Sequence, residues 1–338
     1  MTATINTDLQ TYKVQQLSLW NAVALLYILL GYFGGITLLC LSSFWLNGLG
    51  TLLLTHGLVC SAYLAHDCMH SAVGKGRRLN VLFGNAMLWI NGGCYYGFDR
   101  LALQHIAHHV QRVDSFTFDI VAAIAQQPRI IRQGILVLEW CYFPIVSFWA
   151  RWRSLLNPFW DPAKRKEIPR IASLLLIRGT LYIILGIASL KALILYFLAY
   201  IAMITVLRWM DAFQHTYEAF PPKSSLPKRD RDYEQAHTFS PLLSSRFPWL
   251  NTLVLNFGYH NAHHALMKAS WHHLPEIHAQ FFLDSDRPTI SLIQQLANYH
   301  RFRLKRLLCG QGEAVDQDGN FSLEHFFGAV DVSFLMLY

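Results

Sequence analysis

Eight histidines of this chain stand in three short clusters whose spacing suits metal binding. The clusters are His66 and His70; His105, His108 and His109; and His260, His263 and His264. On a helix, residues three and four apart share one face, so each cluster would point its imidazoles in one direction. Neutral imidazole binds iron, copper, nickel and zinc. Eight such groups exceed what a single ion can hold, so the pattern favours a site for two metal ions over histidines that only satisfy hydrogen bonds in a polar layer.

The composition places these histidines in a membrane protein. Of the 338 residues, 53% are hydrophobic and only 14% are charged, and the mean hydropathy is +0.26. Soluble domains carry roughly 25% charged residues, so this chain lacks the charge to cover a soluble surface. The six cysteines show no ligand spacing and indicate a reducing compartment without disulfides.

Four apolar segments are long enough to cross about 30 Å of hydrocarbon. They cover residues 19–41, 49–65, 171–190 and 192–210. Their order predicts an all-α integral membrane fold of two transmembrane helical hairpins. We expect a single domain over residues 1–338, with a cytoplasmic helical cap that carries the metal site.

The charge distribution predicts the orientation of these spans. Residues 71–170 contain 13 lysines and arginines against 6 acidic residues, whereas the turns of both hairpins are almost uncharged. Because cytoplasmic loops carry the positive excess, this segment, both termini and all three clusters are expected in the cytoplasm.

Three further segments have weaker signals. Residues 81–96 are apolar but interrupted by Asn85, Asn91 and glycines, as in a re-entrant or interfacial segment, and could line a substrate path or only anchor the chain in lipid. Residues 135–150 contain Glu139 and Pro144 and predict one helix on the membrane surface. Residues 221–231 are polar and predict a surface loop.

The order of the clusters resembles the membrane-bound fatty acid desaturase/hydroxylase superfamily. Its pattern is HxxxH, HxxHH, a membrane hairpin and a second HxxHH, matched here by H66-D-C-M-H70, H105-I-A-H-H109 and H260-N-A-H-H264. The segment W209-M-D-A-F-Q-H215-T also matches, since members carry a further ligand histidine after the last span. The resemblance extends from the first span to about Pro275.

The resemblance implies a non-heme centre of two iron ions that uses O2 and two external electrons to oxidise an unactivated C–H bond of a fatty acyl chain. The implied ligands are His66, His70, His105, His108, His109, His215, His260, His263 and His264. Asp67, Asp211 and Asn261 are candidates to orient these ligands or to act on a metal through water. Asp211 stands where some relatives have asparagine.

Other polar residues near the clusters have more ordinary explanations. Asp99 and Asp114 flank the second cluster, and we expect both to be surface acids. His56 lies within the second span and is expected to form hydrogen bonds there. The remaining histidines fall outside the family pattern: His237, His272, His273, His278, His300 and His325.

Electrons would have to come from a separate partner. The sequence has no heme-binding HPGG, no GxGxxG and no ferredoxin-like cysteine set. The net charge of +7 suits an acidic carrier such as a ferredoxin or cytochrome b5, and also suits anionic lipid. No nucleic-acid partner is expected.

The motifs leave the reaction open. A fatty acid desaturase is the leading hypothesis. Hydroxylation of a lipid or carotenoid, and oxidative decarboxylation of a fatty acid to a 1-alkene, start from the same hydrogen abstraction. A membrane metal transporter or sensor is the alternative from another class, but it should place ionisable residues along its spans, which here contain little beyond His56 and Arg178.

Overall fold

The structure is a computed structural model that describes residues 12, 16–116, 119–221, 224–282 and 289–330. The chain is mostly helical and contains two short parallel strand pairs. The helices are α2 (Leu19–Cys40), α3 (Phe44–Met69), α4 (Gly76–Asn91), α5 (Phe98–Gln111), α6 (Ile120–Ala125), α7 (Arg129–Trp140), α8 (Ile145–Leu156), α9 (Ile168–Ala188), α10 (Leu190–Asp211), α11 (Arg231–Ala236), α12 (His260–Ala265), α13 (Leu274–Phe281), α14 (Leu292–Phe302) and α15 (Lys305–Cys309). The strands are β1 (Asp114–Ser115), β2 (Ala219–Phe220), β3 (Ser240–Pro241) and β4 (Thr289–Ile290).

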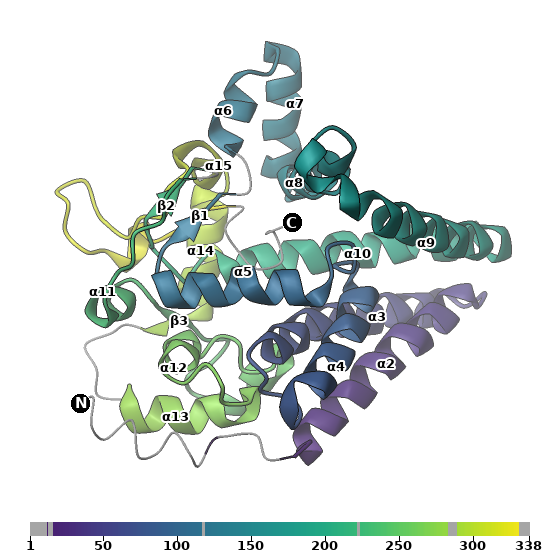
Figure 1. Ribbon diagram of the computed structural model, residues 1–338, viewed down its shortest axis with the longest axis horizontal. Coiled ribbons are helices and arrows are strands. Elements are labelled where there is room, and N and C mark those ends of the chain that lie inside the picture. Colours follow the sequence, from purple (N-terminus) through teal and green to yellow (C-terminus); the bar gives the residue numbers. More distant parts are fainter. Residues whose placement is uncertain (1–11, 13–15, 117–118, 222–223, 283–288, 331–338) are drawn as a thin grey trace.

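The four predicted spans are confirmed as helices. Within the described residues, α2, α3, α9 with its preceding turn, and α10 are long and apolar enough to cross a membrane. They extend toward the right in Figure 1, whereas the strands and the short helices α11 to α15 lie on the left. Large apolar side chains cover their outer faces, such as Leu30 on α2, which is 63% exposed, and Ile187 on α9, which is 83% exposed. Such faces suit contact with lipid tails, so the chain is a multi-pass membrane protein.

Glycines allow α2 and α3 to pack closely. An added Cβ at Gly50 would lie 2.8 Å from Leu38 Cβ and 2.9 Å from the Gly35 carbonyl oxygen. Small residues at such positions let two membrane helices approach to backbone contact. The hairpin turn is closed by Asn47, whose amide donates to the Leu38 and Leu41 carbonyls at 2.9 Å each.

Helix α3 is longer than predicted at both ends. Ser43 caps its N-terminus, and the helix continues past residue 65 until His70. Every residue from Gly57 to Met69 is buried, including Asp67. The polar residues therefore do not end the helix, because their side chains have partners inside the protein rather than in water.

The single surface helix predicted over residues 135–150 is wrong. Two helices, α7 and α8, take its place and meet at a bend of 116°. Pro144 has no N–H to continue α7, and Tyr142 adopts a positive φ of 63°. Glu139 stabilises the break, since one carboxylate oxygen accepts from the Val146 amide at 2.8 Å and the other pairs with Arg208 at 2.8 Å.

The predicted interrupted segment at residues 81–96 is a helix followed by a short loop. Its first part belongs to α4, which packs against α3, and the helix ends at Gly92 with a positive φ of 81°. Its relation to the membrane stays a prediction. The predicted loop at residues 221–231 contains no helix or strand before α11 in its described part.

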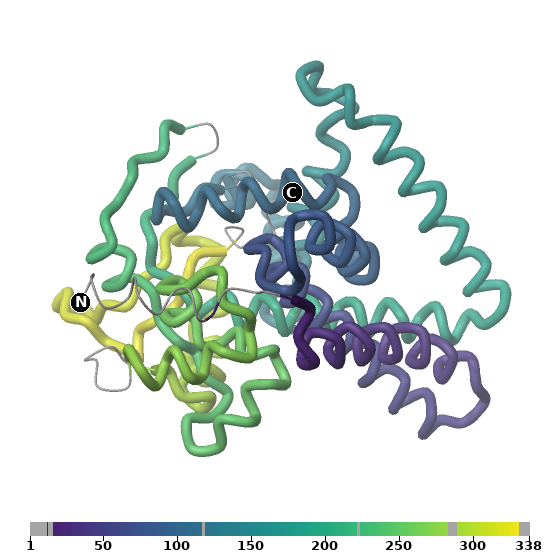
Figure 2. The backbone as a smooth tube through the Cα atoms, turned by 60° about the horizontal axis from the view of Figure 1, so that its bottom comes forward, coloured from purple at the N-terminus to yellow at the C-terminus, as the bar shows by residue number. Residues whose placement is uncertain are grey.

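Two parallel strand pairs join segments of the chain that lie outside the spans. β1 follows α5 and pairs with β2, and β3 pairs with β4. Figure 2 shows the segments after α10 folded together on one side of the long helices. Trp271 ties this part to the spans, because its amide donates to Asp67 on α3 and its indole donates to Asn21 on α2, both at 2.9 Å.

Candidate metal centre

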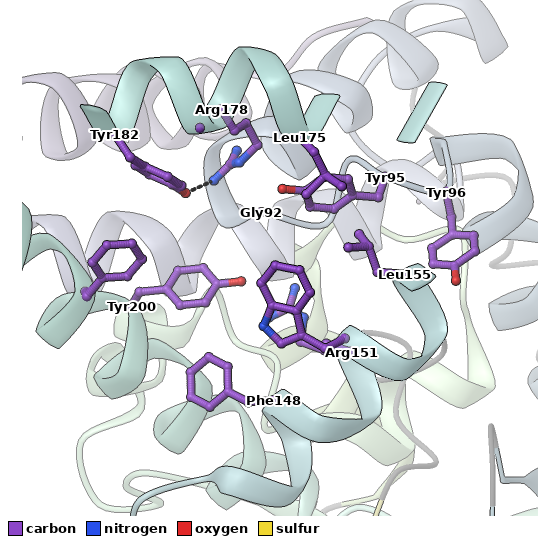
Figure 3. Close-up of a pocket in the computed structure, with 13 residues that line it drawn as sticks. Gly92, Tyr95, Tyr96, Phe148, Arg151, Leu155, Leu175, Arg178, Tyr182 and Tyr200 are labelled. Carbon is purple, nitrogen blue, oxygen red and sulfur yellow. Dashed lines mark hydrogen bonds between the residues drawn. The ribbon is translucent and has the colours of Figure 1, made fainter. Parts of the chain in front are cut away.

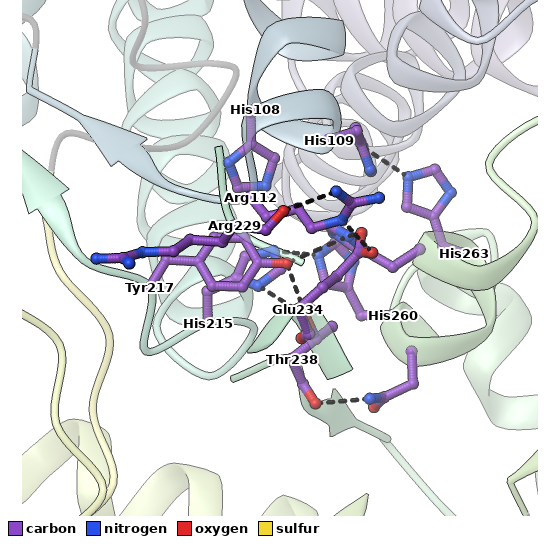
Figure 4. A network of polar contacts seen from close by, with 12 residues as sticks. His108, His109, Arg112, His215, Tyr217, Arg229, Glu234, Thr238, His260 and His263 are labelled. Atoms are coloured by element: carbon purple, nitrogen blue, oxygen red, sulfur yellow. Dashed lines mark hydrogen bonds and ion pairs between the residues drawn. The ribbon is translucent and has the colours of Figure 1, made fainter. Parts of the chain in front are cut away.

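All nine predicted histidines converge in one region, and Figure 4 shows the part around His108, His215 and His260. Two separate groups have nitrogen atoms within 4.8 Å of one another and could each hold a metal ion. The first group is His66, His70, His105, His109 and His263, and the second is His108, His215 and His264. His260 joins the second group, because its Nε2 lies 2.8 Å from His215 Nε2.

Four stretches of chain bring these groups together. His66 lies in the last turn of α3 and His70 caps it. Helix α5 begins after Gly97, whose φ is 82°, and presents His105 and His109 to α3 and His108 to the other side. The six-residue helix α12 contributes the third cluster to both groups, and His215 follows α10. The predicted i, i+3, i+4 arrangement on helices is confirmed for the second and third clusters.

Side chains around the two groups fix the orientation of several imidazoles. The Nδ1 atoms of His66, His108 and His264 lie 3.3, 2.9 and 3.0 Å from carboxylate oxygens of Asp67, Asp114 and Glu234, respectively. A carboxylate accepts only, so each Nδ1 carries the hydrogen and each Nε2 keeps its lone pair.

His215 has the same orientation through a hydroxyl. Thr238 Oγ1 donates to the Glu234 carbonyl at 2.7 Å, which leaves it to accept from His215 Nδ1 at 3.3 Å and from the Tyr217 hydroxyl at 2.9 Å. His215 Nε2 therefore also presents a lone pair toward the centre of its group.

Several inward nitrogens lie close to one another. His105 Nε2 is 2.8 Å from His70 Nε2 and 3.0 Å from His109 Nε2. The buried Nε2 atom of His264 has no hydrogen-bond partner among the described residues. Lone pairs converging in a buried space, with partners behind them, are the donor set that a cation requires. The residues present therefore fit the metal that the motifs imply.

Burial keeps most of these imidazoles neutral. Burial lowers the pKa of His263 to about 3, and burial together with neighbouring imidazoles lowers the pKa of His105, His109 and His264 well below the usual value. His108 differs: burial opposes its protonation, but the charge and hydrogen bond of Asp114 raise its pKa. Neutral imidazole is the metal-binding form.

The three residues that the sequence suggested as orienting the ligands have different surroundings. Asp67 lies beside His66, as expected. Asp211 ends α10, and its charge helps to raise the pKa of His108. Asn261 does not bond to an imidazole in the described structure. It donates to the Thr238 carbonyl at 2.6 Å and accepts from the Ser240 hydroxyl at 2.8 Å, which fixes α12 on the segment before it.

Of the two flanking acids, only one is a surface residue. Asp99 is exposed and pairs with Arg77, as predicted. The expectation for Asp114 is wrong, because pairing of β1 with β2 buries its carboxylate against His108.

His56 forms hydrogen bonds within the protein, as predicted, with the Tyr27 hydroxyl and the Leu253 carbonyl. The six histidines outside the pattern belong to neither group in the described structure.

Sequence reasoning missed Glu234, Thr238 and Tyr217. Glu234 is buried, lies within 4.8 Å of both His109 and His264, and pairs through its other oxygen with Arg112 Nε at 2.7 Å. Glu234 lies in a charged stretch of the sequence, which predicts an exposed loop. The one available signal is Asp230, which caps α11 and so places Glu234 on a helix.

Comparison of the sequence with protein families gives a match over most of the chain. The model of the family described as fatty acid desaturase matches residues 43–292. The chain belongs to the fatty acid desaturase family. The match includes α3 through α12 and hence all nine histidines. Among curated proteins, the comparison finds no match. Membership supports oxidation of the desaturase or hydroxylase type at a histidine-ligated metal and implies a fatty acyl substrate in a membrane setting.

Proposed function

We propose that this protein is a fatty acid desaturase that uses two iron ions, O2 and external electrons to introduce a double bond into an acyl chain. The observation that carries the proposal is the convergence of inward Nε2 atoms in two adjacent groups. His66, His70, His105, His109 and His263 would hold one ion, and His108, His215, His260 and His264 the other. The metal centre would supply the oxidant, since no side chain removes hydrogen from an unactivated C–H bond.

The chain's own residues would hold the ligands in place and keep water out. Asp67, Asp114, Glu234 and Thr238 would hold the protons at Nδ1 of four ligands, which aims each Nε2 at a metal. Phe257 stacks on Tyr63 with ring centroids 4.3 Å apart, and its ring centroid lies 4.9 Å from that of His66. These apolar rings would exclude water from one side of the first group and accept the apolar chain.

The membrane setting supports a fatty acyl substrate and a separate electron donor. An acyl chain is dissolved in the bilayer that the four spans cross, so it would reach the site without entering water. The positive excess of residues 71–170 favours a cytoplasmic position for the site and for a soluble acidic carrier, a ferredoxin or cytochrome b5.

Replacing one ligand tests the metal assignment. His263→Ala should lower the iron content of the purified protein and reduce oxygen-dependent turnover by more than about 100-fold. Iron is measured by elemental analysis and turnover by product mass spectrometry. His278→Ala is the control, since His278 is also a buried histidine but belongs to neither group. Unchanged iron and turnover in His263→Ala would overturn the proposal.

Product analysis tests the reaction. After expression in a host with a suitable electron donor, lipids and hydrocarbons are profiled by mass spectrometry. A new double bond is the expected result. A new hydroxyl or a 1-alkene, formed only when the nine histidines are intact, would replace desaturation with hydroxylation or decarboxylation.

A further inference from the structure

A cavity of about 310 Å³ lies between α8, α9, α10 and the end of α4 (Figure 3). Thirteen residues line it, and none of them is acidic. Its walls are largely aromatic, with Phe148, Tyr182 and Tyr200 among them, and two arginines, Arg151 and Arg178, supply positive charge. The cavity contains none of the nine histidines of the metal centre.

Arg178 lies in the middle of α9 and is only 4% exposed. Its guanidinium donates to the Trp89 carbonyl at 2.5 Å and to the Tyr182 hydroxyl at 2.7 Å. These bonds use two of its five N–H groups, and the neighbouring Cys94 thiol is a weak acceptor. Among the described residues, no carboxylate forms an ion pair with Arg178.

The surroundings of Arg178 neutralise only part of its charge. Trp89 belongs to the last turn of α4, and a helix C-terminus carries about half a negative charge. A cation within a membrane span is costly, and it usually faces the bundle interior or a water-filled cavity and pairs with an anion or with backbone carbonyls. The remaining positive charge faces a cavity with aromatic walls, which suits a ligand with an anionic head and an apolar chain.

We propose that this cavity binds the anionic head group, a carboxylate or a phosphate, of a single-chain amphiphile. The N–H groups of the guanidinium that have no partner in the protein would donate to the oxygens of either group. Phe197 lines the cavity and is 42% exposed, and we place the entry of the ligand from the bilayer beside it. The aromatic walls pack against the first methylenes of the chain.

The same helix provides a control for a purely structural role. Arg170 donates to the Cys94 and Tyr95 carbonyls at 2.9 and 3.2 Å, so it also ties α9 to the segment after α4. It does not line the cavity. If Arg178 only fastened helices together, replacing either arginine would affect stability, and neither replacement would alter a preference for anionic ligands.

Binding to the full-length protein in nanodiscs tests the proposal. The probes are hexadecanoate, hexadecyl phosphate and hexadecanol, which share a chain and differ in the head group. Wild-type protein and Arg170→Gln should bind at least one anion more than about tenfold more tightly than the alcohol, and Arg178→Gln should lose this preference. The preferred anion identifies the source of the ligand. No preference in the wild type, or the same preference in Arg178→Gln, overturns the proposal.

Filling the cavity gives a second test that leaves Arg178 in place. A Cβ added at Gly179, which lines the cavity, meets nothing within 4 Å. Gly179→Leu should abolish binding of both anions without unfolding the protein, since glycine is a weak helix former. Gly34→Leu, on α2, adds the same side chain to open space away from the cavity and should bind as the wild type does. Unchanged binding in Gly179→Leu contradicts the proposal.

The result of these binding experiments does not depend on the proposed oxidation. Because no metal ligand lines the cavity, His263→Ala should bind the probes as the wild type does. Loss of iron in that variant and loss of anion preference in Arg178→Gln are therefore separate results, and either can fail alone.

Discussion

Carboxylates behind His66, His108 and His264 determine which nitrogen of these three imidazoles faces the centre. Glu234 contacts His264 through one oxygen and Arg112 through the other. Burial raises the pKa of Glu234, and Arg112 opposes that rise. The arginine thus helps to keep an anion behind a metal ligand.

Replacing this anion by a neutral amide tests its role. Glu234→Gln keeps the size of the side chain but weakens the acceptor for His264 Nδ1–H, and we expect about tenfold lower metal affinity with little change in secondary structure. Metal titration followed by elemental analysis measures the affinity, and circular dichroism checks the fold.

The matched control is Glu218→Gln. Glu218 is part of the same region but pairs with Arg229 on the surface, so its replacement should leave metal affinity unchanged. Equal affinities for the wild type and Glu234→Gln would show that Glu234 does not orient His264.

At the residue scale, the sequence predicted the histidines but not most of their supports. The histidines repeat at helical spacing, which is a local property of the chain. Glu234 lies 30 residues before His264 and Thr238 lies 23 residues after His215, and only the folding of α11 against the end of α5 brings them to these imidazoles. Asp114 became buried for a similar reason, since strand β2 comes from more than a hundred residues later.

At the scale of elements, close packing of the first hairpin depends on glycine. Gly50→Val would place side-chain carbons against the Gly35 carbonyl and Leu38, so we expect the free energy of unfolding to fall by about 1–3 kcal/mol. Thermal unfolding in detergent measures the change. Gly34→Val serves as the control, because a Cβ there meets nothing within 4 Å. Equal melting temperatures for the two variants would contradict this account of the packing.

The elements that the sequence predicted well are those whose signal is local and strong. The four spans were found within a few residues, because apolar length alone specifies them. The bend between α7 and α8 was missed, although Pro144 marks it. Its stability comes from Glu139, whose partner Arg208 lies 69 residues away on α10.

At the scale of the whole molecule, the spans and the metal centre are mechanically linked. Asp67 and His66 belong to a membrane helix, and Trp271 connects that helix to the segment after the third cluster. The second cluster lies on α5 and the third on α12. The family pattern gives their order along the chain but not their positions in space. Their common location depends on packing between α3, α5 and α12, which no local pattern specifies.

Neutral buried imidazoles make the whole molecule sensitive to acid. The pKa of His263 is lowered from 6.5 to about 3, so between these values the unfolded chain binds a proton that the folded chain does not. Stability therefore falls as pH decreases from about 6.5 toward 3, by up to about 1.4 kcal/mol per pH unit for each such histidine. Protons also compete with metal for the same nitrogens.

We therefore expect both the melting temperature and the iron content to decrease when the pH is lowered from 7.5 to 5.5. The melting temperature of metal-free protein reports the proton linkage alone, and elemental analysis of metal-loaded protein reports the competition. In metal-free His263→Ala, which has one fewer buried imidazole, the melting temperature should depend less steeply on pH than in the wild type. Equal slopes would mean that burial does not hold His263 neutral in the folded protein.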